Sequence, residues 1–407
     1  MKALSFILFF SYLLFTFISC KPDGPPDGYI DYQGKNYKEP VPVMYDSDGD
    51  GIADSEIEVL GTNLSVSQTP DGKPLYKAPE SSADTSNLVP QGEKLCYLNL
   101  ARNCDTYGAL YAFETSMNTD FTQIFESSKT QSIDNNDDGT IDYIEVIRET
   151  KIEALIQDNY AAAALLAKQL FEEVAKPKKI SAFVLENAIK EALQIALLSA
   201  LYDNNEYVDL QMVQQEIMVN VAEALLDVAE ATGFDLEISE NDLQEIVFAV
   251  SESLASDVVS QLGEIVAKEF LAQYNALTTS GDIQTIQGIC PDGYHIPSDA
   301  EWMIFEMALG MSSADLTRSG ITVTDRGADA GVVQKMITEH GFDYSGYVSI
   351  NGTYAQLGEA GVYWSSTAGI DSYGEYVWVR QIDTSYTGVL RYKHYEKSGL
   401  SIRCFKN

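Results

Sequence analysis

The middle of this chain differs from both of its ends in charge and in periodicity. Between Thr119 and Ile283 there are 31 Asp and Glu residues against 9 Lys and Arg residues. Apolar residues there recur three or four positions apart, as at Val213, Ile217 and Val221, which indicates amphipathic helices with one buried face. The flanks are rich in Gly, Pro, Ser and Asp and favour loops and short strands. The chain must therefore accommodate a helical unit between two stretches of loops and short strands.

Residues that typically end or begin helices set the expected helix boundaries. Pro177 stops one helix, Gly233 ends another, and the capping box from Ser239 to Asp242 begins the last. An antiparallel bundle with its acids in water is the simplest arrangement, and a groove that binds a partner is the alternative. The expected helices cover residues 121–131, 143–174, 182–202, 208–232 and 241–274.

The first twenty residues have the pattern of an export signal. Lys2 precedes an apolar run from Leu4 to Ile18, and the segment ends in Ser19 and Cys20. The ending is similar to a bacterial lipobox, so we expect Cys20 to become the lipidated first residue of an outer-membrane lipoprotein. A transmembrane anchor is the alternative, but a run of about 15 residues is short for one. Residues 21–28 form a Pro- and Gly-rich tether.

The net charge of −35 restricts the possible partners. Bulk electrostatics of this sign argue against binding nucleic acid or an anionic membrane surface. The same charge favours solubility outside the cell and binding of calcium. We therefore expect contact with the membrane only through the lipid anchor.

A twelve-residue loop from Asp134 to Glu145 predicts a calcium site. Oxygen ligands stand at the EF-hand loop positions, Gly139 stands where the chain must turn, and helical patterns flank the loop. An acidic turn that binds nothing is the alternative. The expected ligands are Asp134, Asn136, Asp138, Thr140, Asp142 and Glu145.

A second acidic loop spans residues 46–58. Its first nine positions fit a calcium loop, but Ile57 stands where the bidentate carboxylate belongs, so Glu56 or Glu58 would have to replace it. It is similar to the thrombospondin type 3 repeats of bacterial surface proteins, and an Asp- and Gly-rich linker is the alternative. The expected ligands are Asp46, Asp48, Asp50, Ile52 and Asp54.

Two stretches outside the acidic middle carry a family resemblance. The segment LCYLNLARNCDTYGALYAF at 95–113 and the segment ICPDGYHIPSDAEW at 289–302, followed by YWSST at 363–367 and SIRC at 401–404, resemble the Fibrobacter succinogenes major paralogous domain. Tyr294 replaces the Trp usual in that family. The resemblance implies an α+β, C-type-lectin-like and formylglycine-enzyme-like fold with short strands, and a scaffold that displays loops.

In that family the two segments are joined by a short loop. The resemblance therefore implies a discontinuous lectin-like domain, and an all-α bundle carrying the EF-hand would be inserted into it. The expected divisions are a signal peptide at 1–20, a tether with the acidic loop at 21–74, the lectin-like domain at 75–118 with 285–407, and the insertion at 119–284.

Four cysteines remain besides Cys20, an even number that favours two disulfides in an oxidising compartment. Three pairings are open from spacing alone. The family resemblance favours Cys96 with Cys104, which closes a tight loop, and Cys290 with Cys404, which ties the second segment to the end of the chain.

Catalytic motifs are not apparent in the sequence. His295, His340 and His394 are far apart along the chain, without metal-ligand spacing and without a Ser or Cys partner in a known motif. His295 is expected to be a buried hydrogen-bonding residue. We therefore expect the protein not to be an enzyme.

Aromatic residues concentrate between 370 and 396. We expect Val377 and Val379 to point inward along a strand while Tyr376, Trp378 and Arg380 point outward. Rigid aromatic residues beside Ser, Gly and Asp are typical of adaptable binding surfaces. An ordinary strand-rich segment is the alternative. The expected ligand-binding residues are Tyr373, Tyr376, Trp378, Arg380, Tyr386, Arg391, Tyr392, His394 and Tyr395.

These features together predict a non-catalytic, lipid-anchored surface protein with structural calcium, which binds an extracellular protein or glycan through its C-terminal face. In related families certain retroelements diversify this C-terminal region, so a diversified receptor is one form of the hypothesis. The alternatives are an envelope assembly protein that binds its partner through the acidic bundle, and an accessory module for polysaccharide degradation.

Overall fold

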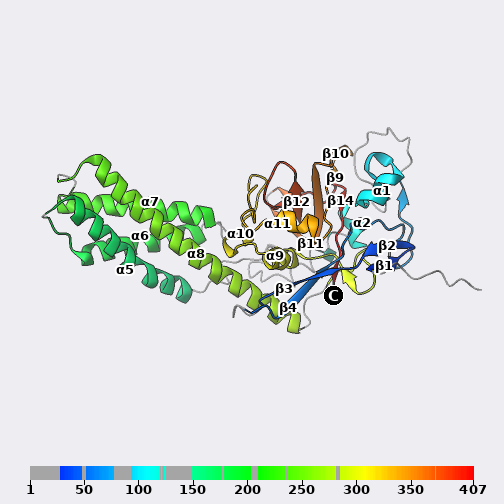
Figure 1. Cartoon of the computed structure of the whole chain (residues 1–407), viewed down its shortest axis with the longest axis horizontal. Coiled ribbons are helices and arrows are strands. Elements are labelled where there is room, and N and C mark those ends of the chain that lie inside the picture. Colours follow the sequence, from blue (N-terminus) through cyan, green and yellow to red (C-terminus); the bar gives the residue numbers. More distant parts are fainter. Residues whose placement is uncertain are drawn as a thin grey trace, which may run out of the picture.

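The computed structural model describes residues 28–47, 52–77, 93–119, 121, 123–124, 149–176, 178–202, 210–234, 237–280, 285–371 and 373–407. Helices and several sheets both occur there, which confirms the predicted mixed α+β class. Figure 1 shows a helical bundle at one end and a mixed part at the other, with the long helix α8 running from the first into the second.

The bundle helices follow the predicted periodicity closely. The boundaries of α6 are as expected, whereas α8 runs six residues past the predicted end at 274. Buried Val213, Ile217 and Val221 line one face of α7, as their spacing predicts. The helix expected at 121–131 lies largely outside the described residues. The bundle helices are α5 (Glu149–Val174), α6 (Ala182–Tyr202), α7 (Leu210–Thr232) and α8 (Glu240–Ser280).

Helix α8 attaches the bundle to the mixed part. Leu262 and Val266 belong to the same cluster of buried apolar residues as Trp302 and Phe305 of α9 (Asp299–Ala308). At Gly263 a Cβ atom would lie 3.2 Å from the backbone nitrogen of Ala314 in α10 (Ser313–Leu316). The absent side chain therefore lets the two helices pack closely. In the described part of the chain, no helix combines the length and apolar character needed to cross a membrane.

The largest sheet collects strands from distant parts of the chain. Its order is β10-β9-β11-β14-β7-β6-β5, and β12 and β13 extend it from β11. These strands are β5 (Tyr76–Lys77), β6 (Glu93–Leu95), β7 (Leu110–Tyr111), β9 (Ser345–Val348), β10 (Tyr354–Leu357), β11 (Ala360–Asp371), β12 (Gly374–Asp383), β13 (Leu390–His394) and β14 (Leu400–Ser401).

Residues on either side of the acidic middle meet in this sheet. Strand β7 pairs antiparallel with β14, and the indole nitrogen of Trp364 donates to the Tyr111 carbonyl at 2.9 Å. The Ile289 amide donates to the Ser116 carbonyl at 2.9 Å. The two ends of the segment expected to be an insertion therefore lie side by side.

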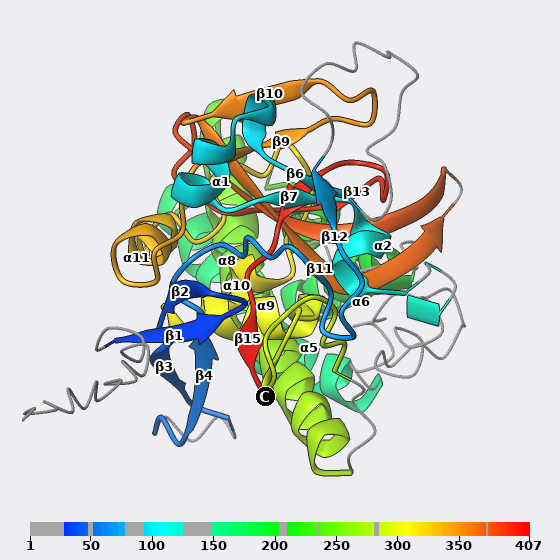
Figure 2. The ribbon, with the colours of Figure 1, turned by 90° about the vertical axis from the view of Figure 1, so that its right-hand side faces the viewer.

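Two smaller sheets complete the mixed part. Figure 2 shows the N-terminal strands below the large sheet, with the C-terminal strand β15 beside them. One sheet has the order β3-β4-β15-β8, and the other is the hairpin β1-β2. The strands are β1 (Tyr29–Tyr32), β2 (Lys35–Lys38), β3 (Val41–Tyr45), β4 (Ser55–Val59), β8 (Tyr294–His295) and β15 (Phe405–Lys406).

The remaining helices are short, and their starts test the capping predictions. The Ser298 side chain accepts a hydrogen bond from the Glu301 amide while the Glu301 side chain caps in return, which confirms the predicted capping box at α9. Ser239 likewise accepts from the Asp242 amide at the start of α8. The other helical segments are η1 (Tyr97–Asn99), α1 (Ala101–Tyr107), α2 (Phe113–Met117) and α11 (Val332–Thr338).

Candidate functional site

Strands β12 and β13 carry most of the residues that we predicted to bind a ligand. Their register opposes Trp378 to Lys393 and Arg380 to Arg391. Val377 and Val379 are buried in the core, as the alternation predicts. Trp378, Arg380, Lys393 and Arg391 therefore share the opposite face.

That opposite face is not open to solvent along its whole length, so the predicted outward exposure of Tyr376, Trp378 and Arg380 was wrong. Arg380 is 0% exposed, Trp378 2% and Tyr376 4%, and the neighbouring Arg391 is 3% exposed. Helix α9 and the segment after it cover this part of the face. Asp299 of α9 binds both Arg380 and Arg391, and the Thr317 carbonyl accepts a hydrogen bond from Arg391. The Arg391 guanidinium in turn lies over the Trp378 ring, 3.8 Å from its centroid.

The covering elements are held by a cluster of buried charges. Arg380 binds Asp299 through Nη1 at 2.6 Å and Glu306 through Nε at 2.7 Å. Arg391 donates to Asp299 Oδ2 at 2.6 Å, and Arg326 donates to Glu306 Oε2 at 2.6 Å. We call these five residues the buried charge cluster. Asp299 is therefore shared by Arg380 and Arg391, and Glu306 is shared by Arg380 and Arg326.

The cluster controls the ionisation of its acids. Burial alone would raise the pKa of Asp299, but Arg391 and Arg380 beside it hold that pKa well below its usual range. The pKa of Glu306 is lowered in the same way, against its own burial, by Arg326 and Arg380. Both acids are therefore carboxylates in the folded protein at neutral pH.

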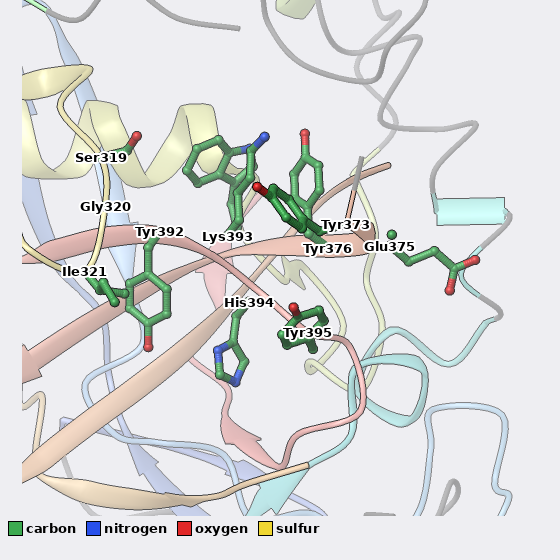
Figure 3. Close-up of a pocket in the computed structure, with 12 residues that line it drawn as sticks. Ser319, Gly320, Ile321, Tyr373, Glu375, Tyr376, Tyr392, Lys393, His394 and Tyr395 are labelled. Atoms are coloured by element: carbon green, nitrogen blue, oxygen red, sulfur yellow. The ribbon is translucent and has the colours of Figure 1, made fainter. Parts of the chain in front are cut away.

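A pocket of about 410 Å³ opens where this cover ends. Figure 3 shows its residues on both sides of β13, with Tyr373 and Tyr376 on one side and Tyr392 and His394 on the other. A volume of this size suits a small ligand group or one or two side chains. The lining residues are Ser319, Gly320, Ile321, Tyr373, Gly374, Glu375, Tyr376, Trp378, Tyr392, Lys393, His394 and Tyr395.

The aromatic rings of this pocket differ in how much of them remains accessible. Lys393 Nζ lies over the Tyr376 ring, 4.2 Å from its centroid, and Tyr376 is buried. Tyr373 and Tyr395 are 86% and 55% exposed. These two rings are therefore the most exposed aromatic side chains of the pocket and can contact a ligand without rearrangement of the fold.

His394 supplies a buried polar group to the pocket. Its ring lies near Trp364 and Tyr392, with centroids 6.0 and 5.8 Å away. Burial lowers the pKa of His394 to about 4, so the imidazole is neutral at ordinary pH. Its Nε2 atom is buried and has no hydrogen-bond partner among the described residues. Because that atom is closed to solvent, it does not reach a ligand in the pocket without movement of the ring.

The pocket joins most of the predicted binding residues but not all of them. Tyr373, Tyr376, Trp378, Tyr392, His394 and Tyr395 line it, whereas Arg380, Tyr386 and Arg391 do not. The sequence prediction missed Gly374, Glu375 and Lys393, which lie within the marked segment, and residues 319–321, which lie outside it. No pattern in the sequence relates residues 319–321 to β13.

Comparison with known families identifies part of the chain. The model of the Fibrobacter succinogenes major domain (Fib_succ_major) matches residues 220–406. The match supports the resemblance drawn from the sequence motifs after residue 289. It begins inside α7, so it takes in α8 and the portion of the mixed part that follows α8, but not residues 28–119. No curated protein and no solved structure matches the chain.

Two disulfides lie in the mixed part of the protein. Cys96 is bonded to Cys104 and Cys290 to Cys404, with Cα atoms 4.9 and 5.9 Å apart. This is the pairing that resemblance to the Fibrobacter succinogenes major domain favours. The second bridge joins residues 114 positions apart. It ties the residue just before β15 to the motif that begins at residue 289. Cys20 lies outside the described residues.

The predicted calcium ligands are mostly outside the described residues. This holds for the whole loop at 134–145 and for Asp48 and Asp50. Asp46, Ile52 and Asp54 are described, and Asp54 Oδ1 accepts from the Ser47 amide at 2.9 Å. Within the described ranges, no group of three or more His, Cys, Asp or Glu side chains is placed to hold a metal ion.

A second cavity, of about 430 Å³, lies between α9, β4 and the end of α8. His295 contributes to it and is 3% exposed, as expected for a buried hydrogen-bonding residue. Its Nδ1 contacts Asn407 Oδ1 and its Nε2 contacts Glu301 Oε1, both at 2.7 Å. Through its two ring nitrogens, His295 therefore links Asn407 to Glu301 of α9.

Acidification should weaken the fold through Asp299. Its pKa in the folded protein is below the ordinary value of about 3.9, so its contribution to stability is complete above that pH and is lost as the pH falls below it. We expect Asp299→Asn to lower the free energy of unfolding at neutral pH by about 3 kcal/mol. Urea unfolding from neutral pH down to about pH 3 should also show a shallower acid loss in this variant than in the wild type.

Asp325→Asn is the matched control. Asp325 also binds an arginine, Arg318, but its side chain is 63% exposed. An exposed pair contributes about 1 kcal/mol or less, so this variant should stay close to the wild type. Equal losses in the two variants, or an unchanged acid slope in Asp299→Asn, would contradict the assigned role of the cluster.

Proposed function

We propose that this protein is a non-catalytic, lipid-anchored surface protein that binds an extracellular protein or glycan at the pocket beside β13. The observation that carries the proposal is the pair of exposed rings, Tyr373 and Tyr395, that line one pocket. Rigid aromatic side chains dominate binding hot spots because they bury a large area at low entropic cost. Glu375 and Lys393 add one charge of each sign.

A binding role is favoured over catalysis by the surroundings of the histidines. His295 has both ring nitrogens occupied by Asn407 and Glu301. His340 packs against Phe305, and burial lowers its pKa. His394 lies among Trp364 and Tyr392 without a nucleophile in contact among the described residues. None of these settings has the base and nucleophile arrangement of covalent catalysis.

The anchor and the calcium site belong to the same proposal. The apolar run before Cys20 and the tether that follows it support export and lipidation, with the folded part outside the cytoplasm at the outer membrane. The loop from Asp134 to Glu145 supports a structural calcium ion. Both disulfides are consistent with an oxidising compartment.

Truncation of the exposed rings should remove binding without unfolding the protein. We expect Tyr373→Ala and Tyr395→Ala each to weaken a ligand identified on glycan and peptide arrays at least tenfold, about 1.4 kcal/mol. Their melting temperatures should stay close to that of the wild type because both side chains are exposed. Trp378→Ala is unsuitable for this purpose because Trp378 is buried beneath Arg391.

Tyr386→Ala provides the control for this experiment. Tyr386 is 39% exposed and belongs to the same aromatic-rich segment, but it does not line the pocket. It should retain full affinity. If Tyr386→Ala lost affinity as Tyr395→Ala did, or if both pocket variants bound normally, ligand recognition at this pocket would be refuted.

Calcium should raise the melting temperature of the full-length protein, because an ion that binds only the folded form stabilises it by mass action. Glu145→Gln should abolish most of that increase, since it replaces the expected bidentate carboxylate. Glu149→Gln changes the same chemistry just beyond the loop and should leave the increase intact. Identical melting curves in calcium and in chelator would count against the site.

A further inference from the structure

A groove on the bundle, remote from the pocket, has the features of a second binding surface. It lies between α6 and α7 and has a volume of about 450 Å³. Val184 and Ile195 border it and are 40% and 51% exposed. The groove thus offers branched apolar side chains that a second surface could bury.

The shape of the groove suits a helix. Ala188 and Ala192 of α6 and Ala224 and Ala231 of α7 line it, and such small side chains allow a third helix to approach closely. From Val184 to Ile195 the lining extends along about 16 Å of α6, or three helical turns. A helix of that length with apolar residues at intervals of three and four positions would fill the groove.

The charges around the groove define the partner further. Glu191, Glu223 and Asp227 line it, and no lysine or arginine does. Helix α7 contains four acidic residues and no basic residue. The lysine nearest in sequence on α6, Lys190, lies instead over the Tyr160 ring of α5. The rim is therefore negative and favours a positively charged partner.

A second copy of this chain is a poor occupant by the same reasoning. Each copy has a net charge of −35, so two copies repel each other. An apolar helix without charges would leave the three rim acids unpaired. We propose that the groove between α6 and α7 docks a basic amphipathic helix of another protein, with its apolar side chains on the alanine floor and its lysines or arginines beside the rim acids. This interaction is separate from recognition at the β13 pocket.

The test uses a fluorescently labelled 14-residue peptide of leucine and lysine in a helical repeat, titrated with the full-length protein while anisotropy is measured. Asp227→Lys should weaken binding at least tenfold. Glu230→Lys makes the same change in net charge on the same helix but outside the groove, and should weaken binding less than twofold. Tyr395→Ala should have no effect, because it alters only the β13 pocket.

A second variant blocks the groove without changing its charge. Ala224→Trp should fill the floor and abolish binding while the melting temperature shows that the bundle remains folded. Equal effects of Asp227→Lys and Glu230→Lys would show attraction to the overall charge only and would overturn the proposal. So would normal binding by folded Ala224→Trp, no binding of the peptide at millimolar concentration, or self-association of the wild type that Asp227→Lys abolishes.

Discussion

The arrangement of the mixed part depends on the ion pairs buried between α9 and the strands β12 and β13. Asp299 and Glu306 lie on one helix, and Arg380 and Arg391 reach them from neighbouring strands. Removing charges from water is costly, so such a cluster is tolerated only when every member has close partners. The geometry that satisfies it also covers Trp378 and limits the accessible face to the region of Tyr373 and Tyr395. The pocket is therefore a consequence of where this cover stops.

The other constraint is the joining of two distant chain segments. Strand β7 lies between β6 and β14, and the Tyr111 carbonyl accepts from Trp364. The Cys290–Cys404 bridge and the contact of Ile289 with Ser116 bring the chain back to the same place. The bundle is not loosely attached, since Gly263 lets α8 lie directly against α10. The proposed ligand pocket thus lies in the mixed part and the proposed docking groove in the bundle, two parts of one connected structure (Figure 1).

The sequence predicts local features well because neighbouring residues determine them. The limits of α6, the cap at Ser298 and the inward direction of Val377 each follow from periodicity or from a side chain within three positions. The burial of Trp378 and Arg380 could not be predicted in this way. Alternation along a strand indicates which residues share a face, but only tertiary structure shows that Asp299, 81 positions from Arg380, covers it. For the same reason no local pattern relates Ser319 to the pocket.

The central claim is that the buried charge cluster holds β12 and β13 in place and thereby shapes the pocket. Hydrogen–deuterium exchange in the wild type and in Glu306→Gln tests it most directly, because exchange reports the local stability of each strand. The account predicts faster exchange in β12, β13 and residues 319–321 of the variant, with α6 and α7 unchanged. Unchanged protection of β12 and β13, or an equal loss of protection in the bundle, would contradict it.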